Sequence, residues 1–230
     1  VQKLHDHNVK SYLHYSVEGL ENEDSYDTSL KEVLNSIEFV SSKSILDYTV
    51  FKPTAIASTH ILEMVSEKKT LNTEENKFYD KIYERFDSIC NLAHKKGVKI
   101  LVDAEESWIQ NAIDEIVLKM MIKYNKKESI VFNTAQMYRH DRLIYLNKLK
   151  ELAEKENFFI GIKLVRGAYI EKENKRAIVR NYKSPICVSK NLSDINYNDG
   201  VSFIISNLRI FSLFSGTHNE ESIYKIIDLM

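Results

Sequence analysis

The 230-residue chain can bury one large hydrophobic core, since 43% of its residues are hydrophobic and 28% are charged. Its formal net charge is −1, so no overall field attracts nucleic acid, and a nucleic-acid partner is not expected. No apolar run reaches the roughly 18 residues that a membrane-spanning helix needs. We therefore expect one domain over residues 1–230, either soluble or touching a membrane only at its periphery.

The sequence predicts no metal site. Cys90 and Cys187 have neither metal-ligand spacing nor the pattern of a disulfide framework, and they weakly favour a reducing compartment. His5 and His7 flank Asp6, but an unsupported polar group of this kind is more often solvated than bound to a metal.

Strand and helix patterns alternate along the chain. Alternation with aromatic and β-branched residues predicts the first strand over 9–17, and an acidic loop follows over 18–27. Apolar runs predict five further strands, over 44–52, 98–103, 129–134, from 158, and over 208–215. Apolar residues at helical spacing predict helices over 30–40, 54–69, 74–96, 109–124, 143–155, 192–207 and 223–230.

The stretch Phe158–Tyr169 organises the rest of the chain. Its first half is a continuous apolar run, which predicts a parallel strand buried on both faces. Lys163 and Arg166 have opposite parity on a strand, so both can face one site only if the strand ends there. Gly167 and Ala168 follow at once. The pattern indicates the rim of a site for an anion and a flat ring, and two snorkelling cations at a sheet edge are the alternative.

Polar residues gather where the predicted strands end: Lys52, Asp103, Asn133, Lys163, Arg166 and His218. Asp103 and Asn133 are 30 residues apart, and so are Asn133 and Lys163, which is the length of one βα unit. Six strand–helix units without a hairpin signal predict a parallel sheet with helices outside. Both a closed barrel and an open doubly wound sheet place a site at this edge. No Gly-x-Gly-x-x-Gly follows a strand, which disfavours a Rossmann dinucleotide site.

Five motifs resemble proline dehydrogenase and occur in the family's order: Phe51–Ala55, Val102–Ser107, Phe132–Tyr138, Lys163–Tyr169 and Gly216–Glu220. The motif Lys-Leu-Val-Arg-Gly-Ala-Tyr, sixty residues after Asp-Ala-Glu, is highly specific. The resemblance runs from about Val9 to the last residue. It implies an α/β fold, a distorted (βα)8 TIM-like barrel that is incomplete here, with about six βα units.

The resemblance also implies an activity. Members oxidise L-proline to Δ1-pyrroline-5-carboxylate by hydride transfer to non-covalent FAD, in proline catabolism, and pass the electrons to a membrane quinone. The location implied is cytoplasmic or peripheral to an inner membrane, the mitochondrial one in a eukaryote. The sequence is also compatible with an oligomer.

Site residues are implied by the same motifs. Lys52 and Asp103 resemble the family's active-site ion pair, Tyr169 its substrate-pocket aromatic residue, and Leu164 a residue packed nearby. The implied cofactor-binding residues are Asn133, Gln136, Lys163, Val165, Arg166, Ser189, Thr217 and His218. The two cations would hold the flavin and its pyrophosphate, and the two amides would stand near the isoalloxazine edge. Thr217 and His218 would lie on the adenosine or phosphate side, and Ser189 is the loosest match.

The chain also departs from the family. Ala135 stands where many members have tyrosine, and Ile170 where a large aromatic residue or Met is common. The paired arginines that clamp the substrate carboxylate are absent. We expect them, with two strands and a final helix, to lie beyond these residues, and the chain alone to be inactive. Two alternatives stay open: a catalytically dead or truncated flavin-binding barrel, and a Schiff-base lyase that uses Lys52 or Lys163.

Overall fold

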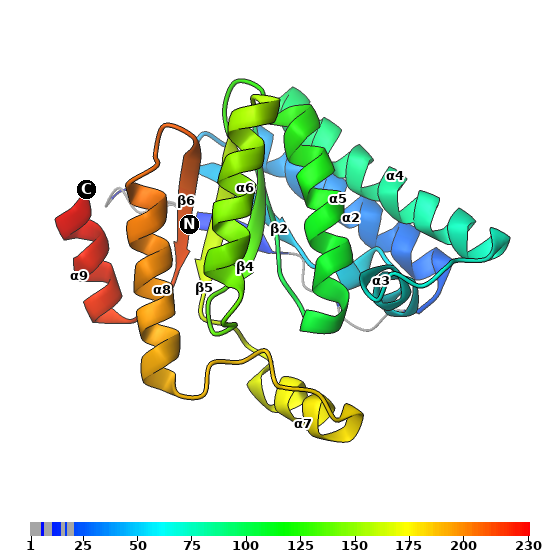
Figure 1. Ribbon diagram of the computed structural model, residues 1–230. Helices are drawn as coiled ribbons and strands as arrows, with labels where there is room; N and C mark the ends of the chain where they lie inside the picture. Colours follow the sequence, from blue (N-terminus) through cyan, green and yellow to red (C-terminus); the bar gives the residue numbers. More distant parts are fainter. Residues whose placement is uncertain (1–5, 7–10, 15–16, 18–20) are drawn as a thin grey trace.

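The computed structural model describes residues 6, 11–14, 17 and 21–230 of the chain. Six strands form one sheet whose order follows the chain, and every neighbouring pair is parallel (Figure 1). The strands are β1 (Ser11–His14), β2 (Leu46–Phe51), β3 (Lys99–Val102), β4 (Val131–Gln136), β5 (Ile160–Val165) and β6 (Phe211–Gly216). The rest of the predicted first strand, and the predicted polar group at His5 and His7, lie outside the described residues.

Helices alternate with the strands, as parallel connections require. They are α2 (Glu23–Ser41), the short 3₁₀ helix η1 (Pro53–Ala55), α3 (Thr59–Ser66), α4 (Thr73–Lys96), α5 (Ser107–Tyr124), α6 (Arg142–Glu156), α7 (Ile170–Arg180), α8 (Lys190–Ile205) and α9 (Glu220–Leu229). Figure 1 shows α7 beyond the carboxyl end of β5, apart from the layer of longer helices. The predicted α/β class, with a parallel sheet and outer helices, is confirmed.

The helix boundaries differ from the prediction in three places. The predicted acidic loop is partly helical, because the Asn22 side chain accepts the Ser25 N–H and caps α2, whose first turn is acidic. The predicted helix over 54–69 is divided into η1 and α3, and Ser58 caps α3. Helix α7 was not predicted, because only Glu173 and Ala177 of it are buried.

Side chains alternate between the two faces of the sheet. The outward positions pack against the helices in the main hydrophobic core. Three inward positions, Val50, Leu101 and Phe132, form a second cluster with Tyr48 and Phe214. This inner cluster fills the concave side of the sheet at the middle of the strands.

Two features close the concave side. Gly161 leaves room for the Phe132 ring, since a Cβ at Gly161 would lie 2.6 Å from that ring. Tyr12 of β1 meets Phe214 of β6 edge-to-face, with ring centroids 5.9 Å apart. The first and last strands of the described sheet therefore approach each other, and the sheet curls like part of a barrel.

Candidate active site

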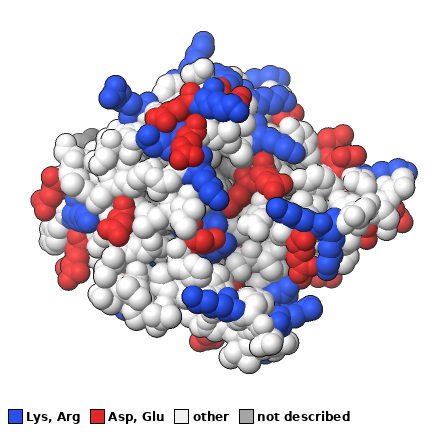
Figure 2. Space-filling model, viewed as in Figure 1, with Lys and Arg blue, Asp and Glu red and all other residues white. Residues whose placement is uncertain are grey.

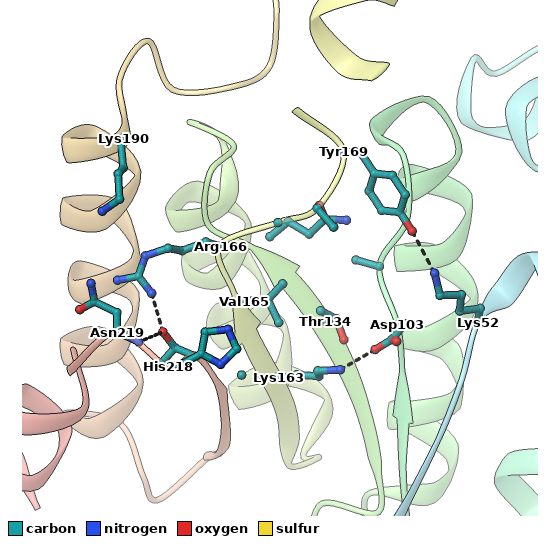
Figure 3. Close-up of a pocket in the computed structure, with 16 residues that line it drawn as sticks. Lys52, Asp103, Thr134, Lys163, Val165, Arg166, Tyr169, Lys190, His218 and Asn219 are labelled. Carbon is teal, nitrogen blue, oxygen red and sulfur yellow. Dashed lines mark hydrogen bonds and ion pairs between the residues drawn. The ribbon is translucent and has the colours of Figure 1, made fainter. Parts of the chain in front are cut away.

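A cavity of about 490 Å³ lies at the carboxyl ends of β2 to β6 (Figure 3). It is lined by Lys52, Asp103, Ala104, Thr134, Gln136, Lys163, Val165, Arg166, Gly167, Ala168, Tyr169, Lys190, Gly216, Thr217, His218 and Asn219. Its volume is in the range of small-molecule sites, and its position is the one at which barrels and open α/β sheets build them.

The floor of the cavity follows from alternation along the strands. Lys52, Asp103 and Thr134 each stand two residues after a member of the inner apolar cluster, so they point to the same side. Two residues further along each strand, the inward side chains therefore change from apolar to polar. Over the face seen in Figure 2, acidic and basic side chains are interspersed.

An ion pair spans the floor between β3 and β5. The Lys163 ammonium donates to Asp103 Oδ1 at 2.6 Å, and the two side chains are 12% and 16% exposed (Figure 3). His14 at the end of β1 approaches the other carboxylate oxygen, with Nε2 3.9 Å away. Because these charges are largely removed from water, each depends on its partner.

This geometry corrects the predicted ion pair of Lys52 with Asp103. Among the described residues, the cation bonded to Asp103 is Lys163, which reaches it past Thr134 on the strand between them. The Lys52 ammonium instead donates to the Tyr169 hydroxyl at 3.2 Å. The curl of the sheet brings the ends of β3 and β5 together, and no sequence pattern shows which lysine then reaches the carboxylate.

Tyr169 forms one wall of the cavity. It is the N-terminal flanking residue of α7, and Lys52 and Lys172 lie over its ring with Nζ 5.8 and 5.3 Å from the centroid. Burial raises the pKa of the Tyr169 hydroxyl, and the Lys52 hydrogen bond opposes that rise. The ring is therefore held in place by two cations.

Arg166 is fixed by three side chains of the rim. It donates to Asp194 at 2.5 Å, to Thr217 Oγ1 at 2.7 Å and to Ser222 Oγ at 2.7 Å, and it stacks on Tyr197 at 4.3 Å. Strand β5 ends at Val165, so both Lys163 and Arg166 line the cavity, as their parity required.

Asp194 joins the two cations on this side of the rim. Its carboxylate also accepts from Lys190 at 2.6 Å. The hydrogen bonds from Lys190 and Arg166 hold the pKa of Asp194 below its usual value. Lys190 and Arg166 make this wall cationic, and Lys163 adds a third cation on the floor beside it.

Gln136 carries an unsatisfied acceptor. Its Nε2 donates to the Glu105 carbonyl at 2.7 Å, but its buried Oε1 has no hydrogen-bond partner among the described residues. A buried amide oxygen without a partner is costly, and such an atom at a cavity commonly awaits a ligand or water.

Glu105 lies behind the cavity wall and joins two loops. Its carboxylate accepts from the Thr54 N–H at 2.8 Å and from the Thr54 hydroxyl at 2.6 Å. Burial raises the pKa of the Glu105 carboxyl to about 6, although both Thr54 hydrogen bonds lower it. The pair ties the turn after Lys52 to the turn after Asp103.

Three residues predicted for the site do not line the cavity. Asn133 is fully buried on the outward side, where its Nδ2 donates to Asp114 at 2.8 Å and to Tyr145 at 2.9 Å. Leu164 also points outward, into the main core. Ser189 is exposed and caps α8 by accepting the Leu192 N–H. The other predicted residues line one cavity: Lys52, Asp103, Gln136, Lys163, Val165, Arg166, Tyr169, Thr217 and His218.

Sequence reasoning missed Thr134, Lys190 and Asn219. Thr134 could have been found, because it lies two residues after the inward Phe132. Lys190 is the first residue of α8 and Asn219 directly precedes α9, and only the folded chain shows that these two helix starts face the cavity. Within the described residues, no group of three or more His, Cys, Asp and Glu is placed to hold a metal ion, and no helix is long and apolar enough to cross a membrane.

The first expectation concerns Gly167, which has φ +129° and faces the Tyr138 ring. A Cβ at this position would lie 2.4 Å from that ring, so Gly167→Ala combines backbone strain with a clash. We expect a loss of about 2–4 kcal/mol in the free energy of unfolding, measured with urea. Gly97→Ala is the control: it also has positive φ, but its Cβ would meet nothing within 4 Å and should cost about 1 kcal/mol. Equal losses would contradict the packing argument.

The second expectation concerns the raised pKa of Glu105. The folded value of about 6 lies above the ordinary 4.5, so the contribution of this group to stability is full below about pH 4.5 and is lost as the pH rises through 6. Glu105→Gln cannot ionise; its oxygen can still accept the Thr54 N–H, and its NH₂ can donate to the Thr54 hydroxyl in place of the bond that the carboxylate accepted. From pH 4.5 to near pH 7, its free energy of unfolding should therefore rise by about 2 kcal/mol relative to wild type.

Urea unfolding at both pH values measures this difference. Glu151→Gln, on an exposed position of α6, is the matched control and should follow the wild type at each pH. A constant offset between Glu105→Gln and wild type would show that Glu105 does not titrate in this range.

Comparison with known proteins gives the family. A family model described as proline dehydrogenase matches residues 1–230. The chain is similar to the carbapenem antibiotics biosynthesis protein CarD of Pectobacterium carotovorum subsp. carotovorum, with 33% identity over 220 residues that cover 95% of this chain and 57% of that protein. It is also similar to mitochondrial proline dehydrogenase 1 of Dictyostelium discoideum, with 35% identity over 159 residues, 66% of this chain and 28% of that protein.

A solved structure shares the fold. Proline utilization A (PutA) from Bdellovibrio bacteriovorus superposes with a TM-score of 0.84 at 17% identity, over 99% of this chain and 25% of that one. The chain thus spans little more than half the length of CarD and about a quarter of PutA. Because the family model covers every residue, the chain belongs to the proline dehydrogenase family.

Proposed function

We propose that this chain forms the flavin-binding core of an enzyme that oxidises L-proline to Δ1-pyrroline-5-carboxylate in proline catabolism. FAD is the proposed hydride acceptor, and a membrane quinone the proposed final electron acceptor. Family membership supports the reaction class. The observation that carries the proposal is that Gln136 of one family motif meets Lys163, Arg166 and Tyr169 of another at one cavity.

The residues of the cavity fit a flavin dinucleotide. Its pyrophosphate and electron-rich ring need cationic donors, and Lys163, Arg166 and Lys190 all line the cavity. The ring carries a hydrogen-bond donor, and the buried Gln136 Oε1 is an acceptor without a described partner. These features support roles for Lys163, Arg166, Val165, Gln136, Thr217 and His218 in holding FAD. Asn133 and Ser189 would act only indirectly, since they do not line the cavity.

When bound, FAD would supply the hydride acceptor, which no side chain can provide. The protein's own side chains would position the cofactor and the substrate. Asp103 keeps the Lys163 ammonium at the end of β5, and both groups can remain charged because they neutralise each other. Lys52 fixes the Tyr169 hydroxyl, so the ring forms a constant wall against which a small cyclic amino acid can pack. Such positioned groups act without reorganisation during the reaction.

Flavin retention tests the binding assignment. We expect the chain to purify with bound flavin, visible in its absorbance, and the double variant Lys163→Met, Arg166→Met to be colourless but folded by circular dichroism. The reason is that the cavity loses two charge-assisted hydrogen-bond donors. The control is Arg180→Met with Lys183→Met, which removes two exposed cations elsewhere. Full flavin content in the first variant would refute the assignment.

Turnover tests the activity. In the complete protein, Asp103→Ala should lower kcat/KM for L-proline at least about tenfold, or about 1.4 kcal/mol, because Lys163 loses its partner. Flavin content should fall less than activity. The assay is dye-linked oxidation of proline, and an unchanged kcat/KM would remove Asp103 from the mechanism. Failure of the wild-type protein to oxidise proline would refute the proposed function.

A further inference from the structure

A line of buried hydrogen bonds runs from helix α5 to the cavity. Asp114 accepts from Gln110 Nε2 at 2.8 Å, and Gln110 Oε1 accepts from the Glu105 N–H at 3.1 Å. The Glu105 carbonyl then accepts from Gln136 Nε2 at 2.7 Å. All four residues are at least about nine-tenths buried, with 2–9% of their surface exposed.

The chemistry of each group fixes the direction of this line. A carboxylate only accepts hydrogen bonds, so the amide NH₂ of Gln110 must face Asp114 and its oxygen must face the Glu105 N–H. A backbone carbonyl also only accepts, so the NH₂ of Gln136 must face Glu105. The Gln136 oxygen is therefore turned the other way, and it is the atom left without a partner among the described residues.

Asp114 itself cannot turn. Its Oδ2 accepts from Arg142 at 2.9 Å, and its Oδ1 also accepts from Asn133 at 2.8 Å. Arg142 is in turn held by Asp141 through two hydrogen bonds of 3.0 and 2.7 Å. Asp114 and Arg142 lie on the outward side of β4, behind the cavity. Within this series of hydrogen bonds, Asp114 is connected to the cavity through Gln110.

We infer that Gln110 and Asp114 are positioning residues: they hold the Glu105 backbone in place, its carbonyl fixes the Gln136 amide with the oxygen left to a ligand, and the site therefore selects a ring edge carrying an N–H. The inference rests on the proposed function for the identity of that ring. The oxidised isoalloxazine has a single ring N–H, at N3 of its pyrimidine edge, and it matches a locked acceptor. An edge that presented only acceptors would leave the Gln136 oxygen buried and unpaired.

The test compares FAD with FAD methylated at N3, which cannot donate there. Each is titrated into the full chain after removal of bound flavin, and binding is followed by flavin fluorescence. Wild type should bind FAD at least about tenfold more tightly, the scale of one lost hydrogen bond to a buried acceptor. In Gln110→Met this preference should fall to about threefold or less. Asn111→Met, at an exposed position of the same helix, should keep the wild-type preference.

A second readout does not depend on flavin. The Gln136 side-chain NH₂ signals, assigned by their absence in Gln136→Leu, should exchange slowly with D₂O in wild type and in Asn111→Met. Gln110→Met should accelerate that exchange at least about tenfold, which a loss of stability alone would extend to core backbone amides as well. Should Gln110→Met not fold, Asp114→Asn serves instead. In Asp114→Asn, the new side-chain oxygen accepts from Arg142, so the new NH₂ faces the NH₂ of Gln110 and no hydrogen bond can form between them. The same acceleration of Gln136 exchange is therefore expected.

The outcomes separate the two claims. Wild type that binds neither form of FAD refutes the proposed function and the ligand assignment. Unchanged Gln136 exchange in Gln110→Met and Asp114→Asn overturns the positioning role. Equal binding of both forms by wild type overturns the N–H selection while leaving the proposed function standing.

Discussion

The alternation of side chains along parallel strands determines what this protein can place in its cavity. Val50, Leu101 and Phe132 fill the concave side of the sheet, and Lys52, Asp103 and Thr134 stand two residues later on the same side. The apolar layer excludes water from below, so the charges above it interact in a less polar surrounding than at an open surface. On each of these strands, the last residue of the inner apolar cluster and the first polar residue of the cavity are two positions apart.

The same constraint shows how far the sequence could be interpreted. The apolar runs and the polar residues after them predicted the strands, the parallel sheet and the edge that carries the cavity. Asn133 was assigned to the site from its place near a strand end and from the motifs, and Leu164 from the motifs alone, but both have outward parity beside the inward Thr134 and Lys163. Parity could have corrected these two assignments. The pairing of Asp103 with Lys163 could not be predicted, because it depends on how strongly the sheet curls.

Helix α7 escaped prediction for a different reason: polar contacts hold it. The Glu173 carboxylate is fully buried and accepts from the Ser107 N–H and hydroxyl, both at 2.6 Å, so one helix caps the start of another. Lys172 pairs with Glu106 at 2.9 Å, and Arg176 stacks on Trp108 at 4.5 Å. An apolar period cannot reveal such a helix. Its anchorage matters because Tyr169, at its start, forms a wall of the cavity.

The rim is organised before any ligand arrives. Each of the three guanidinium nitrogens of Arg166 donates one hydrogen bond, to Asp194, Thr217 and Ser222 in turn. Two of its five N–H groups therefore have no hydrogen-bond acceptor among the described residues. Its plane is fixed by stacking on Tyr197. An anion at this wall can therefore be bound without breaking the contacts that hold the cation, and little side-chain entropy is lost on binding. The guanidinium of Arg166 is held by a partly buried carboxylate, that of Asp194. The same carboxylate binds Lys190, so its negative charge reduces the repulsion between Arg166 and Lys190.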